Sequence, residues 1–202
     1  MPRPASEPNG WAMTILSDEQ FLVLNGVHLK KMATAQEIAH AVGLDPSAVA
    51  TALDAAAKTD LLMVTEGKHL LLPEGTHAVH DHYRVAYEGL RSNPDVLSWY
   101  ERFETVNEQF IKQVSEWQST DGDERVQSRL IRTVERLTKN LQEIVPLIPR
   151  YANYVTRFDA SIARVDQGEK DFVCKPTIDS VHNIWFEFHE DILSVIGRPR
   201  DT

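Results

Sequence analysis

The sequence predicts a mainly α protein in which a winged helix-turn-helix is followed by an all-α, bundle-like helical domain. Helix-start signals occur three times before residue 60. Two short apolar runs around a glycine then predict a hairpin, and only helical periodicity follows it. The composition of the 202 residues, 42% hydrophobic and 25% charged, is that of a globular protein.

Capping signals open the first two predicted helices. Residues 1–12 contain prolines and a glycine but few large apolar groups, so we expect a flexible leader there. Ser17 and Gln20 then have the spacing of a capping box, and Thr34 and Glu37 repeat it. Apolar positions follow each box at helical spacing, which predicts two amphipathic helices.

A third helix and the hairpin complete the first predicted domain. Asp45 before Pro46 is a capping acceptor followed by a proline at the first helical position. The apolar runs 61–64 and 69–72 flank a glycine turn and predict two strands. Three helices and a hairpin over residues 13–75 are the order of a winged helix-turn-helix.

The remainder, residues 76–200, is predicted to be an all-helical sensing or dimerisation domain. Apolar residues recur at spacings of three and four along the segments Val96–Trp117, Val126–Ile144, Tyr151–Val165 and Ile178–Ile196. The last segment is apolar around much of its circumference. It should therefore lie at the centre of the domain, with Trp185 buried.

This last helix also carries carboxylates but no Lys or Arg before Arg198. Its acids are Asp179, Glu187, Glu190 and Asp191. A buried carboxylate needs a cationic or hydrogen-bonding partner. At least one of these acids should therefore meet an arginine of another helix, for which the candidates are Arg129, Arg132, Arg136, Arg150, Arg157 and Arg164.

Charge and composition exclude several classes of protein. The net charge of -9 opposes a general electrostatic attraction to nucleic acid or to an anionic membrane. The single cysteine, Cys174, excludes an intramolecular disulfide framework and a Cys-only zinc site. No signal peptide is recognisable, and no apolar run approaches the ~20 residues of a membrane span. We therefore expect a cytoplasmic protein without membrane contact, and no catalytic motif, cofactor or metal site is predicted.

Two groups of histidines raise the question of a metal site. His77 and His80 have a spacing that could share an ion, but His82 points elsewhere, and a solvated helix surface is the favoured interpretation. His182 and His189 lie roughly 10 Å apart along a helix and cannot hold one ion by themselves. They remain either core residues in a polar network or ligand-binding residues.

The aromatic residues of the helical domain are either ordinary core or the wall of a pocket between helices, where bundles often bind ligands. The candidate pocket residues are Tyr100, Phe103, Trp117, His182, Trp185 and His189.

DNA binding is the function that the predicted first domain invites. In a winged helix the second helix of the helix-turn-helix enters the major groove and the wing reaches the backbone. The residues that would face DNA are Ser47, Thr51 and Lys58 on that helix and Lys68 in the wing. However, residues 1–80 hold five Lys or Arg against nine Asp or Glu, which opposes phosphate binding. A winged helix that contacts protein rather than DNA therefore stays open.

Two segments of the chain resemble known families. The first resemblance rests on Thr34–Gly43, Asp45–Val49 and Leu71–Gly75, which look like the winged helix of MarR-type bacterial regulators. The second rests on Tyr100–Phe103, Glu116–Gln118 and above all Asp179–Asp191. These latter stretches are similar to a helical module of actinobacterial proteins that also occurs attached to pyruvate, phosphate dikinase-like or phosphoenolpyruvate synthase-like enzymes.

Together these observations predict a non-enzymatic, winged-helix transcriptional regulator whose helical domain senses a small molecule or mediates dimerisation. Its expected partners are double-stranded DNA, a second copy of the chain in a homodimer, and a small-molecule effector. The alternative, which the second resemblance implies, is a protein-interaction or accessory module for a phosphoenolpyruvate-utilising enzyme, without DNA binding.

Overall fold

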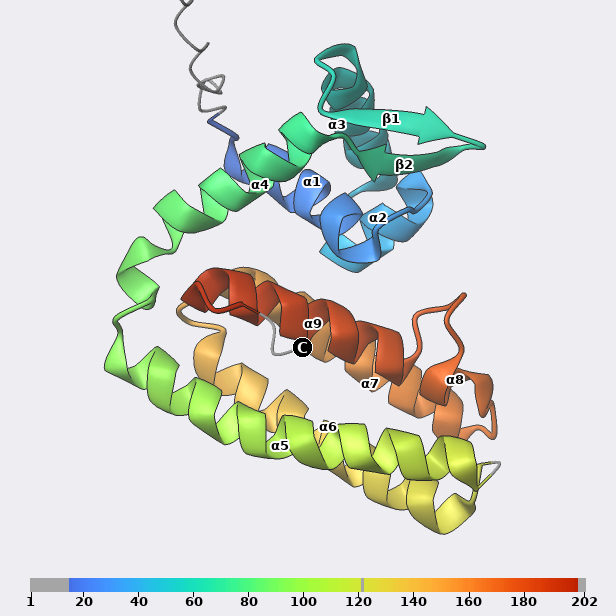
Figure 1. Ribbon diagram of the computed structural model, residues 1–202. Coiled ribbons are helices and arrows are strands. Elements are labelled where there is room, and N and C mark those ends of the chain that lie inside the picture. Colours follow the sequence, from blue (N-terminus) through green and yellow to red (C-terminus); the bar gives the residue numbers. More distant parts are fainter. Residues whose placement is uncertain (1–14, 121, 200–202) are drawn as a thin grey trace, which may run out of the picture.

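The computed structural model describes residues 15–120 and 122–199 (Figure 1). These residues form a mainly helical protein with one two-stranded sheet. In Figure 1 a first group of elements, residues 18–86, lies above a second group, residues 94–196. The predicted leader, residues 1–12, lies outside the described residues.

Three helices precede the sheet, namely α1 (Asp18–Lys30), α2 (Ala35–Val42) and α3 (Pro46–Lys58). Both predicted capping boxes are present, because the side chains of Gln20 and Glu37 accept from the backbone N–H groups of Ser17 and Thr34. Asp45 caps α3, because its side chain accepts hydrogen bonds from the backbone N–H groups of Ser47 and Ala48. The three predicted helices are confirmed.

The sheet is a hairpin of β1 (Leu62–Thr65) and β2 (Lys68–Leu71), paired antiparallel. Glu66 and Gly67 form its turn with φ angles of 52° and 74°, the positive values that a two-residue hairpin turn favours. An isolated bridge from His69 to Ala33 connects β2 to the segment between α1 and α2. The hairpin is confirmed, with each strand shifted by one residue from its predicted bounds.

Helix α4 (Pro73–Ala86) packs against α1. The ring of Phe21 stacks on His82 at 3.9 Å between centroids and meets Tyr83 edge-on at 5.0 Å. A Cβ atom at Gly75 would lie 2.0 Å from the carbonyl oxygen of Leu61, so only glycine permits this approach of α4 to the hairpin. The predicted domain boundary after residue 75 thus lies in the first turn of a helix that packs on the first group.

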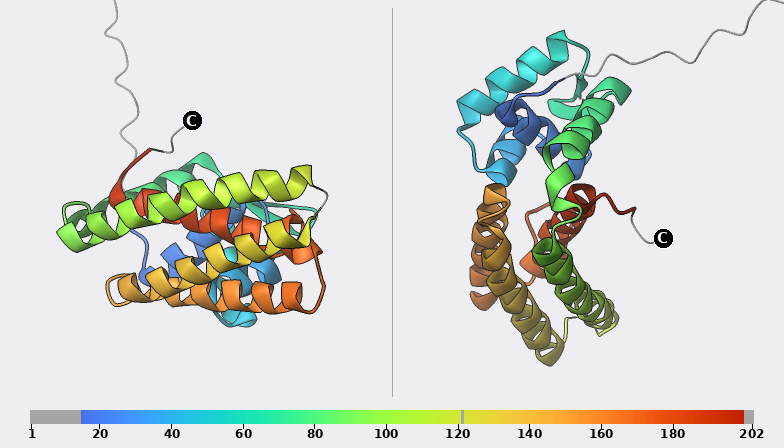
Figure 2. Two further views of the ribbon diagram at one scale, coloured as in Figure 1. Left: turned by 90° about the horizontal axis from the view of Figure 1, so that it is seen from below. Right: turned by 90° about the vertical axis from the view of Figure 1, so that its left-hand side faces the viewer.

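The second group holds α5 (Pro94–Ser119), α6 (Glu124–Ile144), α7 (Ala152–Asp166), α8 (Asp171–Cys174) and α9 (Val181–Ile196), with 3-10 turns at Glu88–Leu90 and Pro149–Tyr151. Figures 1 and 2 show α5 and α6 as an antiparallel pair. The indole N–H of Trp99 on α5 donates to the carbonyl of Asn140 on α6 at 2.7 Å. Within the described residues no strand follows β2, as predicted.

Helix α9 lies at the centre of the protein, as predicted from the apolar residues around much of its circumference. None of its residues is exposed, and Trp185 keeps 2% of its surface accessible. Trp185 stacks on Phe110 of α5 with ring centroids 3.8 Å apart. On the adjoining face, Phe188 meets Phe103 of α5 and Tyr151 edge-on, each at 5.3 Å. The predicted burial of Trp185 is confirmed.

The predicted start of the last helix at Ile178 is wrong by three residues. Ser180 is the N-cap of α9 and accepts from the backbone N–H of Asn183 at 3.4 Å. Asp179 therefore precedes the helix instead of belonging to it, and its carboxylate is free to turn toward α1 and α7.

Candidate functional site

The outer side of α3 is an exposed face of small and polar side chains. Ser47, Thr51 and Lys58 are all exposed there. The hydroxyl of Ser47 donates to Asp45 Oδ1 at 2.5 Å, and that of Thr51 donates to the carbonyl of Ser47 at 2.9 Å. Asp54 is exposed at the same helical spacing, so the face carries one base and one acid.

Lys68 lies in a different setting from the other three predicted DNA-facing residues. It lines an open groove of about 670 Å³ between α2, the hairpin and the segment that leads into α9. Lys30, Lys31 and Phe186 also line this groove, whereas the α3 residues do not. The structure thus brings Ser47, Thr51 and Lys58 together on one helix and places Lys68 over the junction of the two groups.

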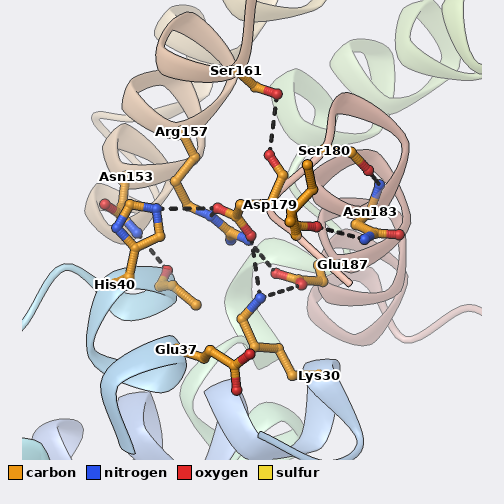
Figure 3. A network of polar contacts seen from close by, with 12 residues as sticks. Lys30, Glu37, His40, Asn153, Arg157, Ser161, Asp179, Ser180, Asn183 and Glu187 are labelled. Carbon is orange, nitrogen blue, oxygen red and sulfur yellow. Dashed lines mark hydrogen bonds and ion pairs between the residues drawn. The ribbon is translucent and has the colours of Figure 1, made fainter. Parts of the chain in front are cut away.

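A buried ion-pair network crosses that junction (Figure 3). Arg157 of α7 donates from Nε and Nη2 to the two carboxylate oxygens of Asp179, both at 2.7 Å. It also donates to Glu187 of α9 at 2.6 Å. Lys30, at the end of α1, donates to Glu187 at 2.8 Å and to Asp179 at 3.2 Å. Two acids and two bases from three helices and one loop therefore neutralise each other.

The electrostatics of this network favour the charged forms. Burial by itself would raise the pKa of Asp179, but the hydrogen bonds and charge of Arg157, with the charge of Lys30, outweigh it and hold that pKa well below its usual range. Burial would likewise lower the pKa of Arg157, but its bonds to Asp179 and the charge of Glu187 raise it instead. Asp179 and Arg157 therefore stay ionised together.

Helix α2 joins the same network. His40 Nε2 lies 3.3 Å from Asp179 Oδ2, and the side-chain amide of Asn153 on α7 donates to the carbonyl of Ala41 (Figure 3). Gly43, with a φ of 70°, ends α2 beside Asn153, where an added Cβ would lie 3.0 Å from the amide oxygen. The C-terminal end of α2, the first helix of the predicted helix-turn-helix, thus packs against α7.

A second polar cluster surrounds Asp191 of α9. Arg150 pairs with its carboxylate. The hydroxyls of Tyr151 and Tyr154 donate to it at 3.1 and 3.3 Å. Asn25 of α1 lies at hydrogen-bond distance, 3.5 Å. Burial, and then the charge of Asp191, raises the pKa of both tyrosines well above 10, so both remain hydrogen-bond donors.

Arg150 links this cluster to the first group of elements. Its guanidinium donates to the hydroxyl of Tyr87 and lies over that ring, 4.8 Å from the centroid. It also lies 5.6 Å from the ring centroid of Phe21 on α1. The predicted meeting of an acid from the last helix with an arginine is confirmed twice, at Arg150 and at Arg157.

A cavity of about 210 Å³ lies between α5 and α9. Its lining consists of Asn107, Phe110, Ile111, Val114, Ser115, Gln118, His182, Trp185, Phe186 and His189. Three of the six predicted pocket residues therefore meet here: His182, Trp185 and His189. Tyr100 and Phe103 are buried in the core instead. Trp117 lines a separate groove with Lys170 and Cys174, and its indole ring lies beside Gly122, where an added Cβ would be 3.4 Å from the ring.

Sequence reasoning missed two kinds of functional residue. Lys30 lies in the last turn of α1, where the helix dipole favours a cation in any case. The sequence therefore offered no reason to pair Lys30 with Asp179. Asn107 is a polar residue beside the apolar stripe of α5 and is 5% exposed. A buried asparagine needs hydrogen-bond partners, so its position beside that stripe was the signal that could have identified it.

Three histidines of the first group pack against other aromatic rings, and Cys174 is half-buried. His82 stacks on Phe21, while His80 meets His28 edge-on at 5.1 Å. Across residues 15–120 and 122–199, no three or more His, Cys, Asp or Glu side chains are placed to hold a metal ion. Burial raises the pKa of Cys174 to about 11, so its thiol stays protonated at neutral pH.

In the same residues, no helix combines the length and the apolar composition needed to cross a membrane. Comparison with protein-family models, curated proteins and solved structures finds no match to the chain.

Proposed function

We propose that the chain is a winged-helix transcriptional regulator that binds double-stranded DNA through α3 and the hairpin. The observation that carries this proposal is the exposed face of α3, with Ser47, Thr51 and Lys58, in a chain order of three helices followed by a tight hairpin. That is the order in which winged helices present a recognition helix and a wing.

The local chemistry of α3 supports the proposal. The helix has 13 residues and is capped by Asp45, so it can project as a stable rod. Val49 and Leu53 bury its inner side at 0% and 1% exposure, which leaves the outer side to solvent. Small side chains there allow close approach to a groove, and short hydroxyls suit either base edges or phosphates.

The junction supports a sensing role for the second group. An ion pair joins Lys30 of α1 to Glu187 of α9, and Asn25 of α1 lies 3.5 Å from Asp191 of α9. The groove of about 670 Å³ that Lys68 lines opens beside the first of these contacts. A molecule that changes the position of α9 would therefore change the position of α1 and, through it, of α2 and α3. This is the coupling that an effector-responsive regulator requires.

Selection of genomic DNA fragments with the purified full chain tests the proposal. We expect a defined set of fragments to be enriched at low salt. Lys68→Glu should weaken binding to all of them alike, because it removes a phosphate contact. Lys112→Glu on α5 makes the same charge change on an exposed helix surface and should leave binding intact. Random recovery of DNA, equal to that with no protein, would reject the proposal.

Homodimerisation is part of the proposal. One copy offers only Lys58 and Lys68 among the predicted DNA-facing residues as cations, and two copies related by a twofold axis would double that number. Sedimentation at the concentrations used for DNA binding should give twice the 22.9 kDa mass of one chain.

A second candidate is a protein-contact module for a phosphoenolpyruvate-utilising enzyme. The observation that favours it is charge, because Asp45, Asp54 and Asp60 are exposed in and around α3 and outnumber the exposed Lys58. An acidic face repels DNA and suits a basic partner surface. Failure of DNA selection, combined with salt-sensitive binding to such an enzyme that Asp54→Lys abolishes, would favour this candidate.

A further inference from the structure

We propose that the cavity between α5 and α9 binds a small, uncharged, planar aromatic molecule that presents a carbonyl oxygen to Asn107. The inference deepens the proposed sensing role and rests on it for its biological consequence. Binding itself is independent of DNA and is measured without it.

The lining of the cavity selects against charged ligands. Within residues 15–120 and 122–199, no Lys, Arg, Asp or Glu lines it, although a quarter of the residues in the chain are charged. Burial lowers the pKa of His182, so this imidazole is neutral at pH 7. His189 Nε2 lies 3.5 Å from Glu104 Oε1, an acid that would repel an anion. An anionic ligand would lose hydration here without a Lys or Arg to pair with, and a cationic ligand would find no Asp or Glu in the lining itself.

Asn107 supplies a directed hydrogen-bond donor. It is 5% exposed, and its Oδ1 accepts from the indole N–H of Trp185 at 2.9 Å. Because an indole N–H can only donate, this bond fixes which end of the amide faces Trp185. Among the described residues the amide Nδ2 of Asn107 has no hydrogen-bond partner. Its two N–H groups are therefore left for an acceptor in the cavity, and a carbonyl oxygen is the matching group.

The remaining walls suit a flat ring. Phe110 and Trp185 are parallel to within 5° and stacked at 3.8 Å, so they form a rigid aromatic wall. Phe186 is half-buried, and Ile111, 55% exposed, lies at the solvent edge of the cavity. The volume of about 210 Å³ is below the ~300–1,000 Å³ of sites for drug-sized ligands. A molecule of one or two rings matches this size.

Matched pairs of amides and acids test the ligand class on the full-length protein. Nicotinamide and benzamide have the carbonyl and no charge, whereas nicotinate and benzoate have nearly the same shape and a negative charge. In titration calorimetry or ligand-observed NMR we expect saturable binding of the amides and at least roughly tenfold weaker binding of the acids. Equal or tighter binding of the acids, or no saturable amide binding at millimolar concentration, would overturn the proposal.

Two variants locate the binding. Asn107→Asp keeps an oxygen for Trp185 but removes both N–H donors, and amide affinity should fall by roughly tenfold. Ile111→Glu puts a charge at the edge of the cavity without touching the core, and it should also weaken amide binding. Val85→Glu on α4 is the matched control, since Val85 is 57% exposed and lies outside the cavity. Amide affinity unchanged in both cavity variants would place the ligand elsewhere and overturn the proposal.

The outcomes separate this inference from the proposed function. Amide binding with failed DNA selection would remove the regulator but keep the site. DNA selection without amide binding would keep the regulator but remove the site.

Discussion

Trp185 is the side chain through which α9 contacts α5 most closely. It is 2% exposed, stacks on Phe110 and donates to Asn107. We expect Trp185→Ala to lower the free energy of unfolding by ~3–5 kcal/mol, the usual cost of deleting a large core aromatic. Urea unfolding followed by circular dichroism measures this. Trp117→Ala, at a half-buried position, is the control and should cost less; equal costs would contradict the central position of α9.

Arg157 is a second residue whose loss should be costly. Its side chain is 2% exposed and meets two acids, Asp179 and Glu187. Arg157→Met removes the arginine from both acids and leaves Lys30 as the lysine that pairs with them, so it should cost ~3–5 kcal/mol. Arg129→Met breaks an exposed pair with Glu116 and should cost under ~1 kcal/mol. Comparable losses in the two variants would mean that the junction network adds nothing beyond a surface pair.

At this scale the sequence predicted types of residue better than their partners. The acids of the last helix implied an arginine because an unpaired buried charge is costly, and Arg150 and Arg157 are the arginines that meet them. Which of six arginines would serve depends on how α7 is rotated, and that is set by packing. Packing likewise decides that His182 lines the cavity between α5 and α9 while Tyr100 does not.

Ser180 shows what decides the ends of an element. The apolar spacing of Ile178 and Val181 continues across the true start of α9, so periodicity alone extends the helix too far. The hydroxyl of Ser180 accepts a hydrogen bond from the N–H of Asn183, so α9 begins directly after Ser180. The capping boxes of α1 and α2 could be identified from the Gln or Glu three residues after the capping residue. Ser180 has Asn183 at that position and forms no capping box. The short helix α8 (Asp171–Cys174) was missed because one turn has no measurable periodicity.

Ser180→Ala tests this element directly. The residue is buried, and its loss should leave one backbone N–H of α9 unsatisfied at a cost of about 1 kcal/mol. Ser194→Ala removes a hydroxyl from the same helix that donates only to the carbonyl of Glu190, so it should cost less. Thermal unfolding of the two variants compares them. A greater loss at Ser194 would place the structural start of α9 elsewhere.

At the scale of the whole molecule, the junction between the two groups was beyond the reach of sequence reasoning. Lys30 and Asp179 are 149 residues apart, and Asn25 and Asp191 are 166 apart. Local periodicity and capping signals cover a few turns of chain and say nothing about such pairs. The elements themselves were predictable because each is marked by its own caps, turns and apolar faces.

The stability of the folded protein should depend on pH, because folding buries histidine side chains and lowers their pKa values. Burial, and then the charges of Lys31 and His80, lowers the pKa of His28 to about 4, from 6.5. Between these values the unfolded chain binds more protons, so the stability from a neutral His28 is complete above pH 6.5 and is lost as the pH falls toward 4. The pKa values of His80, His82 and His182 are lowered by burial in the same direction.

We therefore expect the free energy of unfolding to fall between pH 6.5 and pH 4. His28→Gln should flatten this decline by up to ~3 kcal/mol, the value of its shift. Urea titrations of both proteins at several pH values in this window measure the effect. Identical slopes for the variant and the native chain would show that His28 is as accessible to protons when folded as when unfolded.

The central claim is that α3 carries the DNA-binding face, and one comparison tests it most directly. Thr51 on α3 and Thr156 on α7 are both exposed, and each hydroxyl donates to the carbonyl four residues earlier, at 2.9 and 3.2 Å. Each is changed to Glu, and fluorescence anisotropy measures binding to the genomic fragment that selection enriches most. We predict that Thr51→Glu weakens binding by roughly tenfold or more, because it sets a negative charge against the DNA backbone, while Thr156→Glu binds as the native chain does. Equal affinity of the two variants for that fragment would contradict the claim.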